Sequence, residues 1–149
     1  MPPLPVFTVH ADPVPRKQLR RFRRDAGWAP DSPYAYSPCF ASGIVRWATL
    51  SDDKSCIAIV RLELAPPQFC CISELIIASS HRHKGLGRYF IKQIEQYCAQ
   101  HGIQRLLLQA VAEASGFYDA LHFIPDPYVC GFLKREISPF QKKSVAGYC

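Results

Sequence analysis

The chain has 149 residues, 48% of them hydrophobic and 20% charged, and its net charge is +6; these are values of a globular protein, and the length suits one domain over residues 1–149. No apolar stretch reaches the roughly twenty residues that a membrane-spanning helix needs. The first residues lack the charged and apolar regions of a signal peptide, so we expect a cytoplasmic protein with no membrane partner.

The N-terminal part is predicted to contain one strand and one strongly basic helix. Residues 6–10 have the pattern of a strand, and a helix is expected over about 15–26. Six of the 18 basic residues lie within 16–24, while Leu19 and Phe22 form an apolar stripe. The basic face is interpreted as a solvated surface, or as an electrostatic guide for a polyanionic cofactor or an acidic substrate.

The following segments are predicted to form a loop and three strands. Residues 27–38 are rich in proline and aromatic residues, which is typical of a loop. Residues 44–50 and 57–64 flank a turn-rich joint and have the pattern of a hairpin. After Pro66-Pro67, residues 69–78 are apolar and β-branched, which indicates a buried strand.

A basic loop containing two glycines follows this strand and precedes a helix that begins near Leu86. The first turn of a helix has unpaired backbone N–H groups, and the helix dipole adds partial positive charge there. Gly85 and Gly87 have no Cβ, so the backbone can come close to a phosphate. Side chains that add positive charge are Arg82, Lys84 and Arg88. The sequence therefore predicts a pyrophosphate-binding site.

The second half of the chain continues with alternating helix and strand patterns. The helix ends at His101-Gly102, and residues 103–111 have the pattern of a second buried strand. Strand, helix and strand together form a βαβ unit, whose two strands are parallel. A short helix is expected within 114–123 and a last strand over 128–135.

The glycine loop fits neither of two common phosphate-binding patterns. It has no Gly-Lys-Ser/Thr string of the Walker type, and Phe90 stands where the dinucleotide fingerprint has its third glycine. What remains, Arg82-x-x-Gly85-x-Gly87, resembles the acetyl-CoA pyrophosphate loop of the GNAT N-acetyltransferase superfamily.

A second segment supports the same resemblance. Residues 114–123 are similar to the family pattern Ala-x-x-Phe-Tyr-x-x-x-Gly-Phe, with matches that include Phe117 and Tyr118. Two positions depart from the family: His122 replaces the usual glycine, and Val111 stands where many members have an asparagine that bonds the pantetheine. The glycine change is expected to alter only a turn, whereas the asparagine change removes one cofactor contact.

The resemblance implies a fold, a co-substrate and its contacts. The expected fold is α/β of the GNAT type: a mixed, mostly antiparallel central sheet with a parallel βαβ core, splayed strands and flanking helices. In this family the pantetheine arm of acetyl-CoA lies between the splayed strands. The residues expected to contact acetyl-CoA are Ile76, Ile77, Arg82, His83, Lys84, Gly85, Leu86, Gly87 and Arg88.

The reaction implied is transfer of an acetyl group from acetyl-CoA directly to a primary amine. Tyr118 is the candidate general acid, because a phenol keeps its proton at neutral pH and can give it to a leaving sulfur. Glu74 is the candidate base and the only carboxylate within the strand at 70–78. The alternatives are a structural hydrogen bond for Tyr118 and, for Glu74, pairing with an arginine or exposure on an open sheet face.

The sequence leaves open both the acetyl acceptor and the functional class of the protein. A small-molecule amine is the first choice of acceptor, and a protein lysine, a protein N-terminus or an aminoacyl-tRNA are the alternatives. A non-catalytic acyl-CoA-sensing module is a second class, and a nucleic-acid-binding protein using the basic helix is a third and less favoured one. Trp28, Tyr34 and Tyr36 either pack in the core or shape an acceptor pocket. A homodimer is compatible with the sequence.

The seven cysteines contain no Cys-x-x-Cys pair, so no metal site is predicted. Most lie among apolar residues, where a cysteine serves as a small core side chain that stays reduced. A nucleophilic cysteine paired with one of the five histidines is the less favoured alternative.

Overall fold

The computed structural model of the chain describes residues 3–33, 35–109 and 115–137. Within these ranges the strands are β1 (Val6–His10), β2 (Ile44–Ser51), β3 (Cys56–Ala65), β4 (Phe69–Ile77), β5 (Arg105–Leu108), β6 (Ile124–Pro125) and β7 (Leu133–Glu136). The helices are α1 (Arg16–Asp25), α2 (Leu86–Gln100) and α3 (Ser115–Ala120), and Ser79–His81 forms one turn of 3-10 helix.

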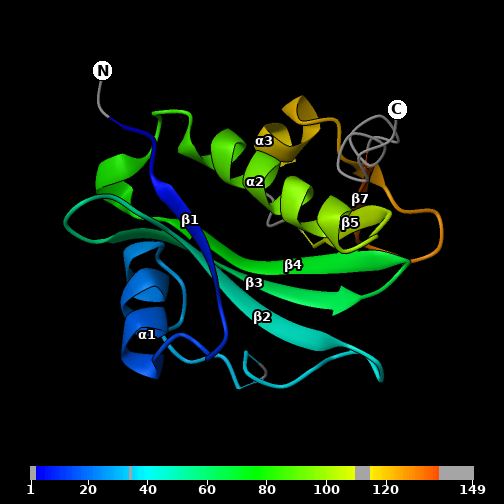
Figure 1. The fold of residues 1–149 in the computed structure, drawn as a ribbon, viewed down its shortest axis with the longest axis horizontal. Coiled ribbons are helices and arrows are strands. Elements are labelled where there is room, and N and C mark those ends of the chain that lie inside the picture. The colour runs from blue at the N-terminus through cyan, green and yellow to red at the C-terminus, as the bar shows by residue number, and fades with distance from the viewer. Residues whose placement is uncertain (1–2, 34, 110–114, 138–149) are drawn as a thin grey trace.

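The strands form one twisted sheet in the order β1-β2-β3-β4-β5-β7-β6 (Figure 1). β4 and β5 are parallel, as expected for strands joined through a crossover helix, and the other neighbours in this sheet are antiparallel. The predicted fold, a mostly antiparallel mixed sheet with a parallel βαβ core, is confirmed.

Helices cover the sheet on both faces, with α1 on one face and α2 on the other (Figure 1). Successive strand residues point to opposite faces, and β3 shows this alternation clearly. Val60 and Leu62 belong to the core that includes Phe90 and Ile94 of α2. Ile59, which directly precedes Val60 and so points to the opposite face, belongs to a smaller core with Leu19 and Phe22 of α1, together with Ile76 of β4. The apolar stripe predicted for the basic helix is therefore buried against the sheet.

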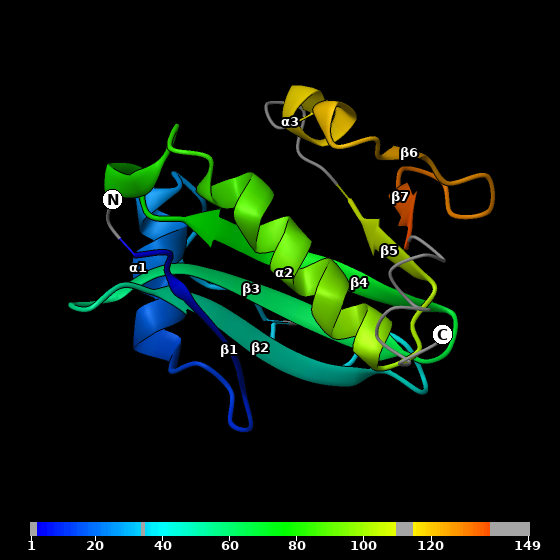
Figure 2. The ribbon, with the colours of Figure 1, turned by 45° about the horizontal axis from the view of Figure 1, so that its top comes forward.

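The two parallel strands separate toward their carboxyl ends. Their paired residues run from Cys70 with Leu106 to Ile72 with Leu108, and β4 then continues to Ile77. Figure 2 shows β5 turning away from β4 toward α3. The separation leaves five residues of β4, 73–77, without a β5 residue opposite them within the described part of the chain.

The structure differs from the sequence expectations mainly in the C-terminal third. The last strand is Leu133–Glu136, later than the predicted 128–135, because Asp126 accepts hydrogen bonds from the N–H groups of Tyr128 (2.7 Å) and Val129 (2.9 Å) and forms a turn there. β5 is shorter than predicted at its start, and residues 110 and 111 of the predicted strand lie outside the described residues. The two-residue strand β6 was not predicted.

His122 has a left-handed φ of 65°, a backbone conformation that glycine adopts readily and other residues seldom adopt. No helix of the described segments combines the length and apolarity that a bilayer crossing requires.

Candidate active site

The N-terminus of α2 presents unpaired backbone donors. Gly85 is the N-cap residue, with φ of 79°, and no side chain of the described residues caps the helix. Its carbonyl accepts the N–H of Tyr89 (3.1 Å), which leaves the first-turn N–H groups of residues 86–88 free to bind a ligand. These donors, together with the dipole of a 15-residue helix, form a site for an anion.

The loop before α2 is held by the end of α1. The carboxylate of Asp25 accepts two hydrogen bonds from Ser79, one from its N–H and one from its hydroxyl, both 2.7 Å long. Arg82 lies 3.5 Å from the same carboxylate and donates a hydrogen bond from Nε to the Ile77 carbonyl (2.9 Å). The hydrogen bonds from Ser79 hold the pKa of Asp25 below its ordinary value of 3.8, so the carboxylate is ionised at neutral pH. Arg82 therefore fixes the loop and also contributes charge.

Two further backbone features shape the loop. His83 has a left-handed φ of 62°, which is uncommon for a residue with a side chain. A Cβ at Gly87 would lie 2.9 Å from Cζ of Phe117, closer than such atoms approach in real structures. The glycine thus lets the ring of Phe117 lie against the first turn of α2, and a larger residue would displace that ring.

The free edge of β4 meets this loop. The N–H of Ala78 donates to the Ile57 carbonyl (2.8 Å), so backbone alternation directs the groups of Ile77 to the opposite edge, where β5 is missing. The Ile77 carbonyl is already bonded to Arg82, while its N–H faces the gap. The gap between β4 and β5 thus ends at the anion site.

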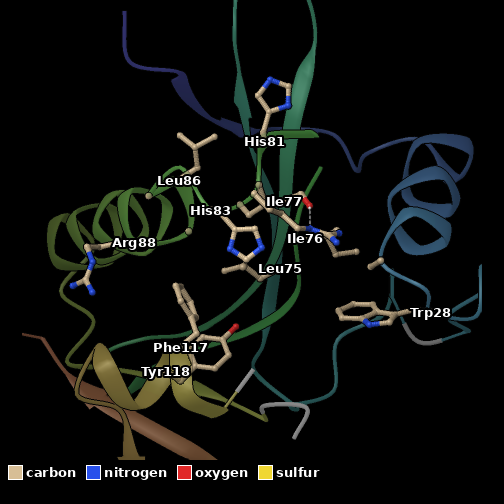
Figure 3. A pocket seen from close by; sticks show the side chains of 14 residues that line it. Trp28, Leu75, Ile76, Ile77, His81, His83, Leu86, Arg88, Phe117 and Tyr118 are labelled. Carbon is tan, nitrogen blue, oxygen red and sulfur yellow. Dashed lines mark hydrogen bonds between the residues drawn. The ribbon is translucent and has the colours of Figure 1, made fainter. Parts of the chain in front are cut away.

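One cavity of about 530 Å³ joins these features (Figure 3). The residues predicted from sequence that line it are Ile76, Ile77, Arg82, His83, Gly85, Leu86, Gly87, Arg88 and Tyr118. Lys84 is exposed and does not line the cavity. Four further lining residues were not among the predicted site residues: Ala26, Leu75, His81 and Phe117. Trp28 also lines the cavity, and the sequence left open whether it packs in the core or shapes an acceptor pocket.

Tyr118 lies at the wall formed by α3, and its side chain points into the cavity (Figure 3). The residue is only 8% exposed, and burial raises the pKa of its phenol to about 12. A phenol with this pKa remains protonated at every physiological pH, which suits a proton donor.

Glu74 lies on β4 next to the cavity-lining Leu75, but it does not line the cavity itself. On β3, one residue separates Ile59 from Arg61. Their partners on β4, Ile76 and Ser73, are separated by two residues, so β4 has a bulge here. Glu74 sits in this bulge with φ of 52°. Left-handed backbone at a non-glycine residue is uncommon and is enriched at functional sites.

The carboxylate of Glu74 is paired with Arg23 of α1. Nη1 of Arg23 contacts both carboxylate oxygens, and the two side chains are 15% and 9% exposed. The sequence left open whether Glu74 is a base, pairs with an arginine or lies on an open sheet face, and in the structure it pairs with an arginine. Because an ionised carboxylate keeps further lone pairs, it can still accept a proton through a water molecule.

The aromatic residues of the proline-rich loop have different positions. Trp28 lines the cavity on the side of α1. Tyr36 packs beside Trp47 with 5.6 Å between ring centroids, and its hydroxyl donates to the Val14 carbonyl (3.0 Å), so it is a packing residue. Tyr34, Val111 and Ala114 lie outside the described residues.

The arrangement can bind a diphosphate, receive an extended polar chain beside β4 and donate a proton at the cavity wall. Within the described ranges, no three His, Cys, Asp or Glu side chains gather closely enough to hold a metal ion.

Comparisons with known proteins agree with this geometry. The model of the "Acetyltransferase (GNAT) family" matches residues 14–123. No curated protein matches the chain. Three similar solved structures, at identities that show likeness of fold, are GCN5 from Tetrahymena (14% identity, 90% of this chain and 97% of that chain, TM-score 0.70), YhbS from Escherichia coli in complex with CoA (13%, 95% and 87%, 0.70) and an acetyltransferase from Elizabethkingia anophelis with acetyl-CoA bound (14%, 87% and 97%, 0.62).

The contact between Asp25 and Ser79 generates a prediction about the anion site. Asp25→Asn removes the negative charge of the carboxylate that Ser79 and Arg82 contact, so the loop before α2 is held less firmly. We expect the affinity for coenzyme A, measured by calorimetry, to fall about fivefold. Asp31→Asn is the matched control, because Asp31 pairs with Arg20 at the exposed side of α1. Equal affinities of Asp25→Asn and the wild type would show that the contact does not organise the site.

Proposed function

This chain belongs to the acetyltransferase (GNAT) family and is an acetyl-CoA-dependent N-acetyltransferase; we propose that it transfers the acetyl group directly to a primary amine of a small molecule. The observation that carries the proposal is one cavity with uncapped amides of α2 at one end and the protonated Tyr118 at its wall. Neighbours of the same fold are described in complex with CoA or acetyl-CoA.

The residues at the N-terminus of α2 fit the diphosphate of coenzyme A. The N–H groups of the first turn and the guanidinium of Arg88 supply donors and positive charge, and His83 and Gly85 give the loop its left-handed turns. The close packing of Gly87 on Phe117 keeps this turn compact. Ile76 and Ile77 border the gap beside β4, where the N–H of Ile77 is available to an amide of the pantetheine arm.

Three tasks fall to the protein in this reaction. Acetyl-CoA supplies the acetyl group as a reactive thioester. Glu74, acting through water, accepts the proton that the amine loses as its nitrogen bonds to the acetyl carbon. Backbone N–H groups near the β4 bulge stabilise the negative charge that develops on the carbonyl oxygen. Tyr118 donates its proton to the sulfur as the carbon–sulfur bond breaks.

Release of free thiol from acetyl-CoA in the presence of small primary amines tests the proposal. We expect thiol release to depend on the amine, with the N-acetylated amine identified by mass spectrometry. Tight binding of acetyl-CoA with no thiol release from any amine would instead identify an acyl-CoA-sensing module.

Tyr118→Phe removes the proton donor while keeping the ring. The expected loss in kcat is about 10²–10⁴-fold, the usual contribution of a positioned general acid, with little change in the KM for acetyl-CoA. Tyr128→Phe is the control, because Tyr128 is 87% exposed. Since the pKa of Tyr118 is about 12, wild-type kcat should show no alkaline fall from this residue below pH 10. A folded Tyr118→Phe protein with wild-type turnover would exclude the role.

Glu74→Gln keeps the size of the side chain and removes its basicity. We expect kcat to fall about 10²-fold or more and the acidic limb of the pH–rate profile to disappear. Circular dichroism shows whether the unpaired Arg23 disturbs the fold. An unchanged acidic limb in a folded variant would assign the proton transfer to another group.

A further inference from the structure

The side of the cavity away from the anion site has an apolar, aromatic wall. Figure 3 shows Trp28 on the α1 side of β4, opposite Leu86 and Arg88 at the start of α2. Ala26 and Ile76 line the cavity near it, and Ile76 belongs to the core cluster against which Trp28 packs. If the cofactor enters from the α2 side, this wall faces the acceptor.

Arg23 holds this wall by three contacts. Its Nε donates to the Ala29 carbonyl (2.6 Å), its guanidinium carbon lies 5.4 Å from the centroid of the Trp28 ring, and its Nη1 contacts both carboxylate oxygens of Glu74. A guanidinium over an indole face is a favourable cation–π arrangement. The indole position and the β4 bulge are thus tied together through one side chain.

The contact between Arg23 and Glu74 also offsets the negative charge of the carboxylate nearest the aromatic wall. Glu74 is paired with Arg23, and the described residues that line the cavity include no aspartate or glutamate. A cationic acceptor therefore finds no free carboxylate among these lining residues.

Basic side chains outnumber acidic ones in two recesses beside the cavity. One of these recesses shares His81 with the cavity and includes Arg21 and the carboxylate of Asp25. The other recess, lined by Arg21, Lys17 and Arg24, continues along α1. Basic side chains repel polycations at long range, so an acceptor with several ammonium groups is disfavoured.

We propose that the acceptor is a monoamine with an apolar, preferentially aromatic, body that packs against Trp28, and that Arg23 is the positioning residue for this wall. The proposal rests on the proposed N-acetyltransferase function and specifies its acceptor. The aromatic ring gains contact area and offset stacking at the indole, and the single amine is directed toward the thioester near Tyr118.

The test compares three amines with the wild-type protein and acetyl-CoA: 2-phenylethylamine, butylamine and spermidine. We expect kcat/KM for 2-phenylethylamine to exceed that for spermidine by about tenfold or more, with butylamine between them. Trp28→Ala should raise the KM for 2-phenylethylamine about tenfold while the KM for acetyl-CoA stays within about twofold. Trp28→Phe, which keeps an aromatic wall, should retain most of the preference.

The role of Arg23 is tested by a matched pair of variants on α1. Arg23→Gln should raise the KM for 2-phenylethylamine about tenfold, because Trp28 loses its support and Glu74 regains a free charge. The same change should improve the relative use of spermidine, which a merely structural defect would not do. Arg20→Gln makes the same charge change at an exposed residue of α1 that pairs with Asp31, and it should behave as the wild type. Arg23→Lys should restore part of the preference.

The outcomes separate the two proposals. Acetylation of spermidine as efficient as that of 2-phenylethylamine, or an unchanged preference in Trp28→Ala and Arg23→Gln, overturns the aromatic acceptor while leaving the N-acetyltransferase function intact. Absence of thiol release with every amine, in folded protein that binds acetyl-CoA, contradicts the proposed function and the acceptor together.

Discussion

The site depends on backbone groups that the sheet and the helix do not satisfy. Among the residues that the structure describes, β4 continues to Ile77 after its pairing with β5 ends at Ile72, and α2 begins at Leu86 without a side-chain cap. Unpaired N–H and C=O groups are costly when buried, so they must face water or a ligand. Both sets of groups border the same cavity, which makes them complementary to a molecule with a diphosphate and an extended amide chain.

α1 braces both halves of this cavity from the opposite face of the sheet. Near its end, Asp25 binds Ser79 of the loop before α2, and Arg23 binds Glu74 of the β4 bulge. Leu19 and Phe22 anchor the helix in the core beneath. The basic residues of α1 therefore have different roles: Arg23 is partly buried and pairs with Glu74, while Lys17, Arg21 and Arg24 are exposed.

The sequence predicted the elements that have a strong local signal. The two glycines and basic residues after an apolar strand indicated the anion site, and the pattern around Tyr118 placed a phenol near it. The partner of Glu74 could not be predicted, because Arg23 is 51 residues away in the sequence. It is also one of six basic residues in the same helix, and nothing in the sequence distinguishes it from the other five. The contact between Phe117 of α3 and Gly87 of α2 could not be predicted either, because it joins two helices that are far apart in the sequence. The shift of the last strand follows from side-chain capping by Asp126, which competes with strand propensity and leaves only a weak pattern.

The central claim is that the amides at the start of α2 bind the diphosphate of coenzyme A. Calorimetric titration of the wild-type protein with coenzyme A, dephospho-coenzyme A and pantetheine tests it most directly. Two charge-assisted hydrogen bonds of about 1.5–3 kcal/mol each correspond to about a hundredfold in affinity or more. Dephospho-coenzyme A, which keeps the diphosphate, should therefore bind nearly as well as coenzyme A, and pantetheine about a hundredfold more weakly. Equal binding of pantetheine and dephospho-coenzyme A would contradict the claim.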